Sequence, residues 1–157
     1  MKRKLFFVGL VLVLAMFFAG CSGTGIITPG INLTGYWTAV AITTSSSDPS
    51  FWPIGGIATA EYSINDNNGT LTIYNFKIIN QEFINWGVGQ GTFNYPGLAI
   101  TISGSYLNIY GYPINITINF QGSINASGLN GSGYFTENFS SLVGTDEVLG
   151  NVTFTKI

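Results

Sequence analysis

The chain has 157 residues, a formal net charge of −2, and only 8% charged residues. Three of its five basic residues stand at positions 2–4, which leaves Lys77 and Lys156 against seven acidic residues. This excludes nucleic-acid binding, because neutralising phosphates needs clustered Lys and Arg. With no histidine and one cysteine, Cys21, the chain lacks the usual ligands of zinc and copper, and we expect neither a metal nor another cofactor.

Residues 1–20 have the organisation of a secretory signal peptide. A basic segment at 2–4 is followed by a mostly apolar run over 5–18 and by the small residues Ala19 and Gly20. The apolar run spans about 14 residues, whereas a membrane-spanning helix needs about 20. We therefore expect residues 1–20 to be cleaved off and the protein to be exported.

The segment Ala19-Gly20-Cys21 resembles the lipobox of bacterial lipoproteins, in which signal peptidase cuts before a diacylated cysteine. Phe18 stands where that family usually has leucine. The resemblance implies that Cys21 carries acyl chains such as palmitate, and two chains give stable membrane anchoring. A lone cysteine in an exported protein also suggests a modified thiol. Ser22 follows the cysteine, which resembles the default for the outer membrane in cells with two membranes.

Residues 21–33 form a linker that contains Gly and Pro, and residues 34–157 form a single domain. In this domain apolar and polar residues alternate, which is typical of strands with one buried face. We expect eight strands, at about 34–43, 54–64, 70–79, 88–94, 98–109, 114–124, 131–139 and 148–156. Because sequential strands usually pair, the simplest fold is an all-β, eight-stranded antiparallel up-and-down β-barrel. An antiparallel β-sandwich of the same strands stays open as the alternative.

The first expected strand begins with Gly35-Tyr36-Trp37, which resembles the Gly-x-Trp motif of lipocalins. In that family the tryptophan plugs the closed end of the barrel, so the resemblance implies a core plug at Trp37 and a lipocalin-like barrel. Two family features find no match: residues 21–157 contain no arginine to pack over this tryptophan, and we expect no helix after the last strand. The resemblance is therefore to the barrel and not to a lipocalin proper.

The expected connections differ between the two ends of such a barrel. Short turn sequences fall at one end, at 66–69, 94–97 and 127–131. Longer segments rich in aromatic residues fall at the other, at 45–53, 80–87, 110–113 and 140–148. We expect the aromatic end to be the mouth of a pocket that faces away from the membrane. Its candidate ligand-binding residues are Phe51, Trp52, Phe83, Trp86, Tyr110 and Tyr112. Packing of these side chains against one another is the alternative.

Two functions are compatible with this sequence. The first is a membrane-anchored lipoprotein of the cell envelope that binds a small apolar or amphipathic ligand in its barrel. The second is a packed structural or interaction module that contacts another envelope protein and takes no ligand. Ala39 and Ala41 share the face of Trp37, and they either leave room inside or fit larger neighbours. We expect no enzymatic activity, because adjacent carboxylates such as Asp146 and Glu147 would point to opposite faces of a strand and would be solvated in a loop.

Overall fold

The computed structural model describes residues 30–50, 52–79, 85–107, 111–141 and 144–157, so the expectations for residues 1–29, Cys21 included, lie outside it. Among the described residues, no helix has the length and apolar character needed to cross a membrane. The strands are β1 (Gly35–Ser46), β2 (Ile57–Asn67), β3 (Thr70–Ile78), β4 (Asn85–Trp86), β5 (Gly89–Asn94), β6 (Gly97–Leu107), β7 (Pro113–Ile124), β8 (Asn130–Ser141) and β9 (Gly144–Lys156).

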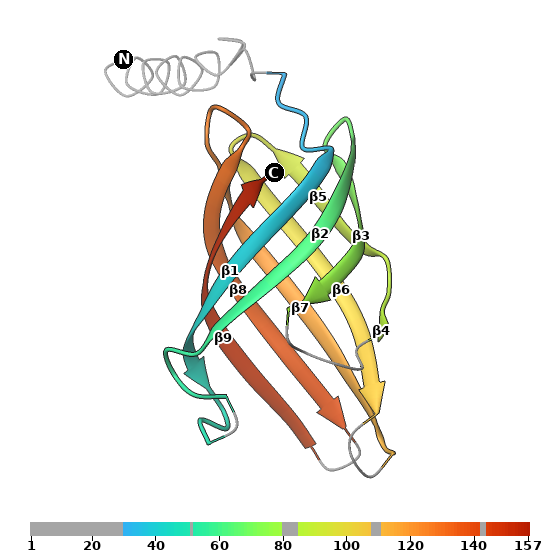
Figure 1. The fold of residues 1–157 in the computed structure, drawn as a ribbon, viewed down its shortest axis with the longest axis vertical. Coiled ribbons are helices and arrows are strands. Elements are labelled where there is room, and N and C mark those ends of the chain that lie inside the picture. Colours follow the sequence, from blue (N-terminus) through green and yellow to red (C-terminus); the bar gives the residue numbers. More distant parts are fainter. Residues whose placement is uncertain (1–29, 51, 80–84, 108–110, 142–143) are drawn as a thin grey trace, which may run out of the picture.

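Eight of these strands close into an antiparallel up-and-down barrel (Figure 1). Strands β1, β2, β3, β5, β6, β7, β8 and β9 each pair with the next, and β9 returns to pair with β1. The two-residue strand β4 pairs with β6 at the edge of this wall. Closure confirms the predicted eight-stranded barrel, which fits the lipocalin-like type, and excludes the sandwich alternative.

Alternation explains why these segments form strands with one face inside. In β7, Ile116 and Ile118 are buried, whereas Asn115, the residue before Ile116, is exposed. The outer face is polar and is joined across strands by side chains; Thr101, for example, donates a hydrogen bond of 2.8 Å to Asn119. Among the described residues, the buried hydrophobic ones lie between Leu33 and Phe154. The strands of the barrel and the residue that leads into β1 therefore build this core.

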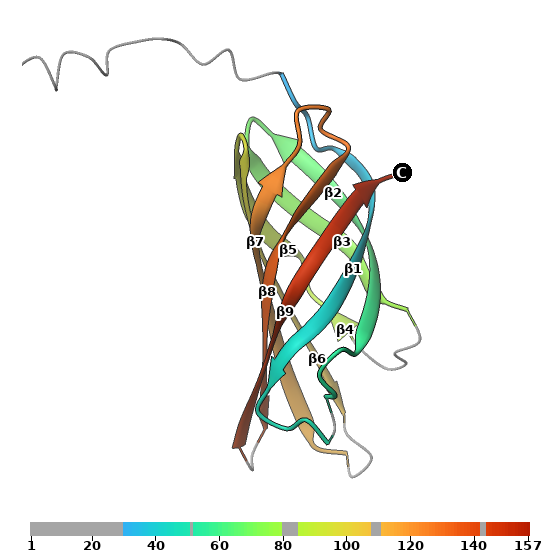
Figure 2. The ribbon, with the colours of Figure 1, turned by 90° about the vertical axis from the view of Figure 1, so that its left-hand side faces the viewer.

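The prediction of a long connection at 140–148 is wrong. Instead of a long loop, β8 and β9 continue as a hairpin in which Asn138 pairs with Glu147 and Ser141 pairs with Gly144. Figures 1 and 2 show β8 and β9 extending past the ends of β2 and β3. Residues 144–147 are exposed on both faces of this extension. They therefore show no apolar alternation, and the sequence pattern could not reveal the strand.

A bulge in β3 changes which residues face the interior. Leu71 and Ile73 point inward at odd positions, whereas Phe76 is buried at an even one. The register between β2 and β3 shifts at this place, and Asn75 has φ of 55°. Asn tolerates this left-handed conformation, and one extra residue moves the following side chains to the other face. The bulge thereby turns Phe76 into the barrel.

Trp37 fills the barrel at the end of the tight turns. Its side chain is fully buried, its Nε1–H donates a hydrogen bond of 2.8 Å to the carbonyl of Leu33, and its ring lies 6.2 Å from that of Phe154. Gly131 makes room there, because a Cβ at this position would overlap the Phe154 ring. The Leu33 amide donates a 3.0 Å hydrogen bond to the Asp66 carboxylate, which fixes the chain as it enters β1.

Candidate functional site

The two ends of the barrel differ as the turn sequences predict. The turns after β2, β5 and β7 lie at one end, beside the start of β1 and the chain's C-terminus (Figures 1 and 2). Strands β1, β6 and β8 end at the opposite end of the barrel, where β2, β7 and β9 begin. Trp52 and Tyr112 lie in the connections between these strands, and Trp86 lies in β4. The end with longer aromatic connections is called the loop end below.

The loop-end aromatic residues take different positions. Trp52 stacks on Phe139, with ring centroids 4.7 Å apart and planes at 22°. Trp86 meets the edge of Phe76, at 4.6 Å and 76°. Tyr112 is 54% exposed and is not part of the cavity lining described next. Trp52 therefore lies at the barrel interior. Trp86 reaches this interior only by its contact with Phe76. Phe51, Phe83 and Tyr110 lie outside the described residues.

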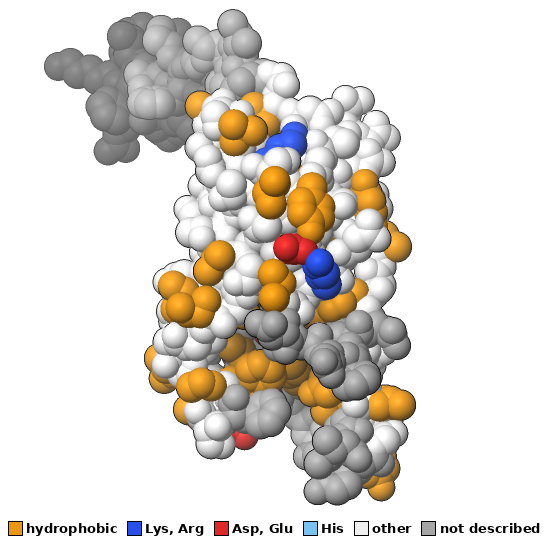
Figure 3. Space-filling model, viewed as in Figure 1, with side chains coloured by type: hydrophobic (Ala, Val, Ile, Leu, Met, Phe, Trp, Pro, Cys, Tyr) orange, Lys and Arg blue, Asp and Glu red, His pale blue; other side chains and the backbone are white. Residues whose placement is uncertain are grey.

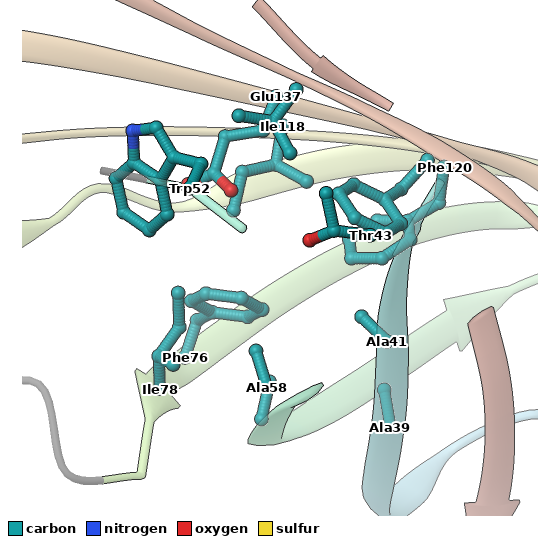
Figure 4. Close-up of a pocket in the computed structure, with 13 residues that line it drawn as sticks. Ala39, Ala41, Thr43, Trp52, Ala58, Phe76, Ile78, Ile118, Phe120 and Glu137 are labelled. Carbon is teal, nitrogen blue, oxygen red and sulfur yellow. The ribbon is translucent and has the colours of Figure 1, made fainter. Parts of the chain in front are cut away.

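A cavity occupies the half of the barrel interior nearer the loop end (Figure 4). Its volume is about 60 Å³, measured as the space open to the centre of a water-sized sphere. In the space-filling view, apolar side chains gather in a recess in the lower half of the molecule (Figure 3). The cavity is lined by Ala39, Ala41, Thr43, Trp52, Ala58, Ala60, Phe76, Ile78, Ile118, Phe120, Phe135, Glu137 and Val148.

The cavity exists because small and large residues face each other across the barrel. Strands β1 and β2 contribute four alanines to the lining, and the register places Ala39 opposite Ala60 and Ala41 opposite Ala58. The facing strands contribute Phe120 and other large side chains. Small residues on one wall and large ones on the other leave space between them. The sequence analysis noted the two alanines of β1 but missed those of β2.

Over the residues that the structure describes, the hydrogen-bonded wall of the barrel is interrupted beside this cavity. The ladder between β3 and β5 ends where Ile73 pairs with Gly89, although β3 continues to Ile78. In the described part of the chain, the last residues of β3 pair only with β2. Ala58, on the neighbouring strand, lines the cavity and is exposed. The cavity therefore communicates with solvent at the loop end.

Among the described residues of the lining, Glu137 is the one ionisable side chain. It lies on β8 between the buried residues Phe135 and Phe139, and it pairs in register with Ile118 and Val148. Its carboxyl oxygens point into the cavity on the side of Trp52 (Figure 4). Burial raises the pKa of this carboxyl to about 7. A charge here is costly because apolar surroundings replace water.

Glu137 was not predicted as a site residue, although the alternation of the sequence places it on the inward face of a strand. Phe135, Glu137 and Phe139 are spaced two apart, so all three belong to the same inward face of one strand. A glutamate on an apolar face is informative, because charged residues are seldom buried without a partner. The adjacent carboxylates of Asp146 and Glu147, which the sequence offers as a pair, are both exposed.

The two lysines of the domain are engaged on the outside of the barrel. Lys77 lies 2.5 Å from the Glu61 carboxylate, which also accepts a 2.6 Å hydrogen bond from the Tyr36 hydroxyl. The hydrogen bond from Lys77 lowers the pKa of Glu61, with a smaller effect from Tyr36. Lys156 donates to the Asn32 carbonyl at 3.1 Å, at the end of the tight turns. Neither lysine is part of the cavity lining.

Within the described ranges, no group of three or more His, Cys, Asp or Glu side chains is placed to hold a metal ion. Neither a family model nor a curated protein matches this chain, and no solved structure matches its fold. The site is therefore defined by its own geometry: an apolar cavity inside a closed barrel, open at the loop end, with one carboxyl group in its wall.

Proposed function

We propose that this protein is an exported lipoprotein, anchored to a cell membrane through Cys21, whose barrel binds a small apolar or amphipathic molecule. The observation that carries the proposal is the cavity walled by alanines in β1 and β2. Protein interiors are close-packed, and a space lined by apolar side chains but open to water costs free energy because that apolar surface stays hydrated. An occupant offsets that cost. The packed envelope module, the second function compatible with the sequence, has no use for the cavity.

The volume limits what the cavity can hold. Measured in this way, one water molecule requires about 10–15 Å³. A cavity of about 60 Å³ therefore accommodates about five non-hydrogen atoms. A larger molecule can place its apolar end inside and extend past Ala58 into solvent. Very small ligands gain at most about 1.5 kcal/mol per non-hydrogen atom. We therefore expect dissociation constants in the micromolar to millimolar range for a fully enclosed ligand of this size.

Filling the cavity with protein atoms should prevent binding. We expect Ala41→Leu to weaken binding of n-butanol by about tenfold or more, because the leucine side chain occupies the space that the alkyl chain needs. Binding is measured by titrating the ¹⁵N-labelled domain, residues 22–157, and following its amide chemical shifts. Ala58→Leu fills the same space from β2 and serves as a second variant.

The matched control is Val40→Leu, which adds one carbon at a residue that is 40% exposed on the outside of the same strand. We expect this variant to bind n-butanol as the wild type does. If n-butanol does not shift the amides of the cavity strands, or if Ala41→Leu and Val40→Leu bind it equally, the ligand-binding proposal is wrong. The packed envelope module would then be the better account of the protein.

The membrane anchor has a separate test. Cys21→Ser removes the thiol that would carry the lipid and before which signal peptidase would cut, so we expect loss of palmitate incorporation and retention of residues 1–20. The measurement is metabolic labelling with palmitate, followed by separation of membranes from soluble proteins. Ser22→Ala, which keeps the cysteine, is the control and should remain labelled and membrane-bound. Unchanged palmitate labelling of Cys21→Ser would contradict lipid anchoring at this residue.

The geometry also supports an orientation for the proposed anchor. Residues 30–33 meet the barrel at the end of the tight turns, where Leu33 is buried. The cavity lies toward the loop end instead, where Ala58 of its lining is exposed. A lipid attached at Cys21 would therefore hold the closed end of the barrel toward the membrane and leave the mouth facing away from it.

A further inference from the structure

Among the described residues, the carboxyl of Glu137 has no hydrogen-bond donor or cation that would stabilise its charge inside the barrel. Lys77 and Lys156 are engaged on the outer surface. A half-buried carboxylate among apolar side chains keeps only part of its hydration, and an opposite charge or good donors can replace what is lost. The cavity thus favours a positively charged or hydrogen-bond-donating group.

The groups around Glu137 leave this preference uncompensated. On the described inner surface of the barrel, the other titratable side chains at or near this level are Tyr62 on β2, Tyr106 on β6 and Asp146 on β9, with Asp48 in the connection after β1. Burial raises the pKa of both tyrosines, and the negative charge of Glu137 raises that of Tyr106 further, so both are neutral at pH 7. Asp146 is exposed and accepts a 3.0 Å hydrogen bond from Ser47.

Aromatic faces provide a second attraction for a cation. Trp52, Phe76 and Phe120 line the same cavity as the carboxyl, and Figure 4 shows their rings around the space into which it points. An ammonium group near aromatic faces is attracted by their ring quadrupoles, and more strongly where water is excluded. A carboxylate together with aromatic walls is a chemical environment that suits a protonated amine.

We infer that the ligand of this cavity is a small amine with an apolar chain, and that the Glu137 carboxylate binds its ammonium group. The inference rests on the proposed function, because it uses the same cavity. The ammonium donates hydrogen bonds to the carboxylate, while the alkyl part lies against the alanines of β1 and β2. A longer amphipathic amine places its remaining chain through the opening beside Ala58.

The pH dependence of binding follows from the ionisation of Glu137. With a pKa of about 7, the carboxyl of the empty cavity is about nine-tenths ionised at pH 8 and about one-tenth ionised at pH 6. An alkylamine stays protonated at both values, as lysine does. Amine affinity should therefore fall about tenfold from pH 8 to pH 6. A ligand that accepts a hydrogen bond from the neutral acid, such as a ketone, would show the opposite trend.

The test compares n-butylamine with n-butanol, which have the same chain and number of non-hydrogen atoms, on the labelled domain at pH 8 and pH 6. At pH 8 we expect the amine to bind about tenfold or more tightly than the alcohol, since hydrogen bonds to charged groups are the stronger ones. The preference should nearly vanish at pH 6. Glu137→Gln should abolish it at both pH values while n-butanol still binds, and the control Glu147→Gln, at an exposed position, should retain it.

The possible results distinguish a failure of this inference from a failure of the proposed function. Binding of n-butanol with no preference for the amine overturns the inference and leaves the proposed function intact. The inference is also wrong if Glu137→Gln keeps the preference, or if amine affinity does not fall from pH 8 to pH 6. Failure of both molecules to bind the folded wild type overturns the proposed function and the inference together.

Discussion

Trp37→Ala is expected to lower the free energy of unfolding by about 3–5 kcal/mol, the range seen when a buried tryptophan is truncated. The side chain is fully buried and packs against Phe154, so its removal leaves a cavity at the end of the tight turns. It also leaves the Leu33 carbonyl without the indole N–H that binds it at 2.8 Å. Urea unfolding followed by circular dichroism measures the effect.

The control is Val40→Ala, on the same strand but 40% exposed on the outer face. Its expected cost is within about 0.5 kcal/mol, as for most surface substitutions. If Trp37→Ala does not accumulate in folded form, Trp37→Phe provides a milder test, because it keeps most of the packing and loses the hydrogen bond. A cost for Trp37→Ala no greater than that of Val40→Ala would show that the tryptophan does not hold this end of the barrel together.

Glu137→Gln is expected to stabilise the protein at pH 8 and to have little effect at pH 4. The folded carboxyl has a pKa of about 7 against an ordinary value of 4.5, so the unfolded chain loses its proton first. Stability should therefore fall as the pH rises from about 4.5 to about 7, and then level off. At 1.36 kcal/mol per pKa unit, reduced for the partial exposure of the site, the gain at pH 8 is on the order of 2 kcal/mol.

Urea unfolding at pH 4, 6 and 8 measures this gain. Glu147→Gln removes the same charge from the same end of the molecule, at an exposed position on β9, and should change the free energy of unfolding little at any of these pH values. If Glu137→Gln and the wild type keep a constant difference in stability across this range, then burial does not perturb Glu137 in the folded protein. The electrostatic basis for amine binding would be lost with it.

The strands and their closure were predictable from the sequence because one face of the barrel is apolar. Alternation such as that of Ile116 and Ile118 indicates a strand wherever its inner face is buried. Turn sequences such as Asn68-Gly69, in which both residues have positive φ, marked the tight end of the barrel. The same reasoning failed for residues 144–147, where the hairpin projects beyond the core and loses its apolar face.

The cavity was less predictable than the barrel around it. Its existence depends on which small residues face which large ones across the interior, and that follows from registers the sequence does not state. The bulge at Asn75 shows this, because it sends Phe76 into the cavity against the alternation of Leu71 and Ile73. Glu137 needed only the spacing of two from Phe135 and Phe139 to be placed inside. Its place in a site depends on the alanines of β1 and β2, which line the same cavity.

The central claim is that the barrel interior admits a small molecule, and intermolecular NOEs test it most directly. In the labelled domain with n-butylamine at pH 8, we expect NOEs from the alkyl protons to the methyl groups of Ala39, Ala41, Ala58 and Ala60, which line the cavity. NOEs only to outward groups such as the methyls of Val40 and Ile42, or none at all in the folded protein, would contradict the claim and favour a packed barrel.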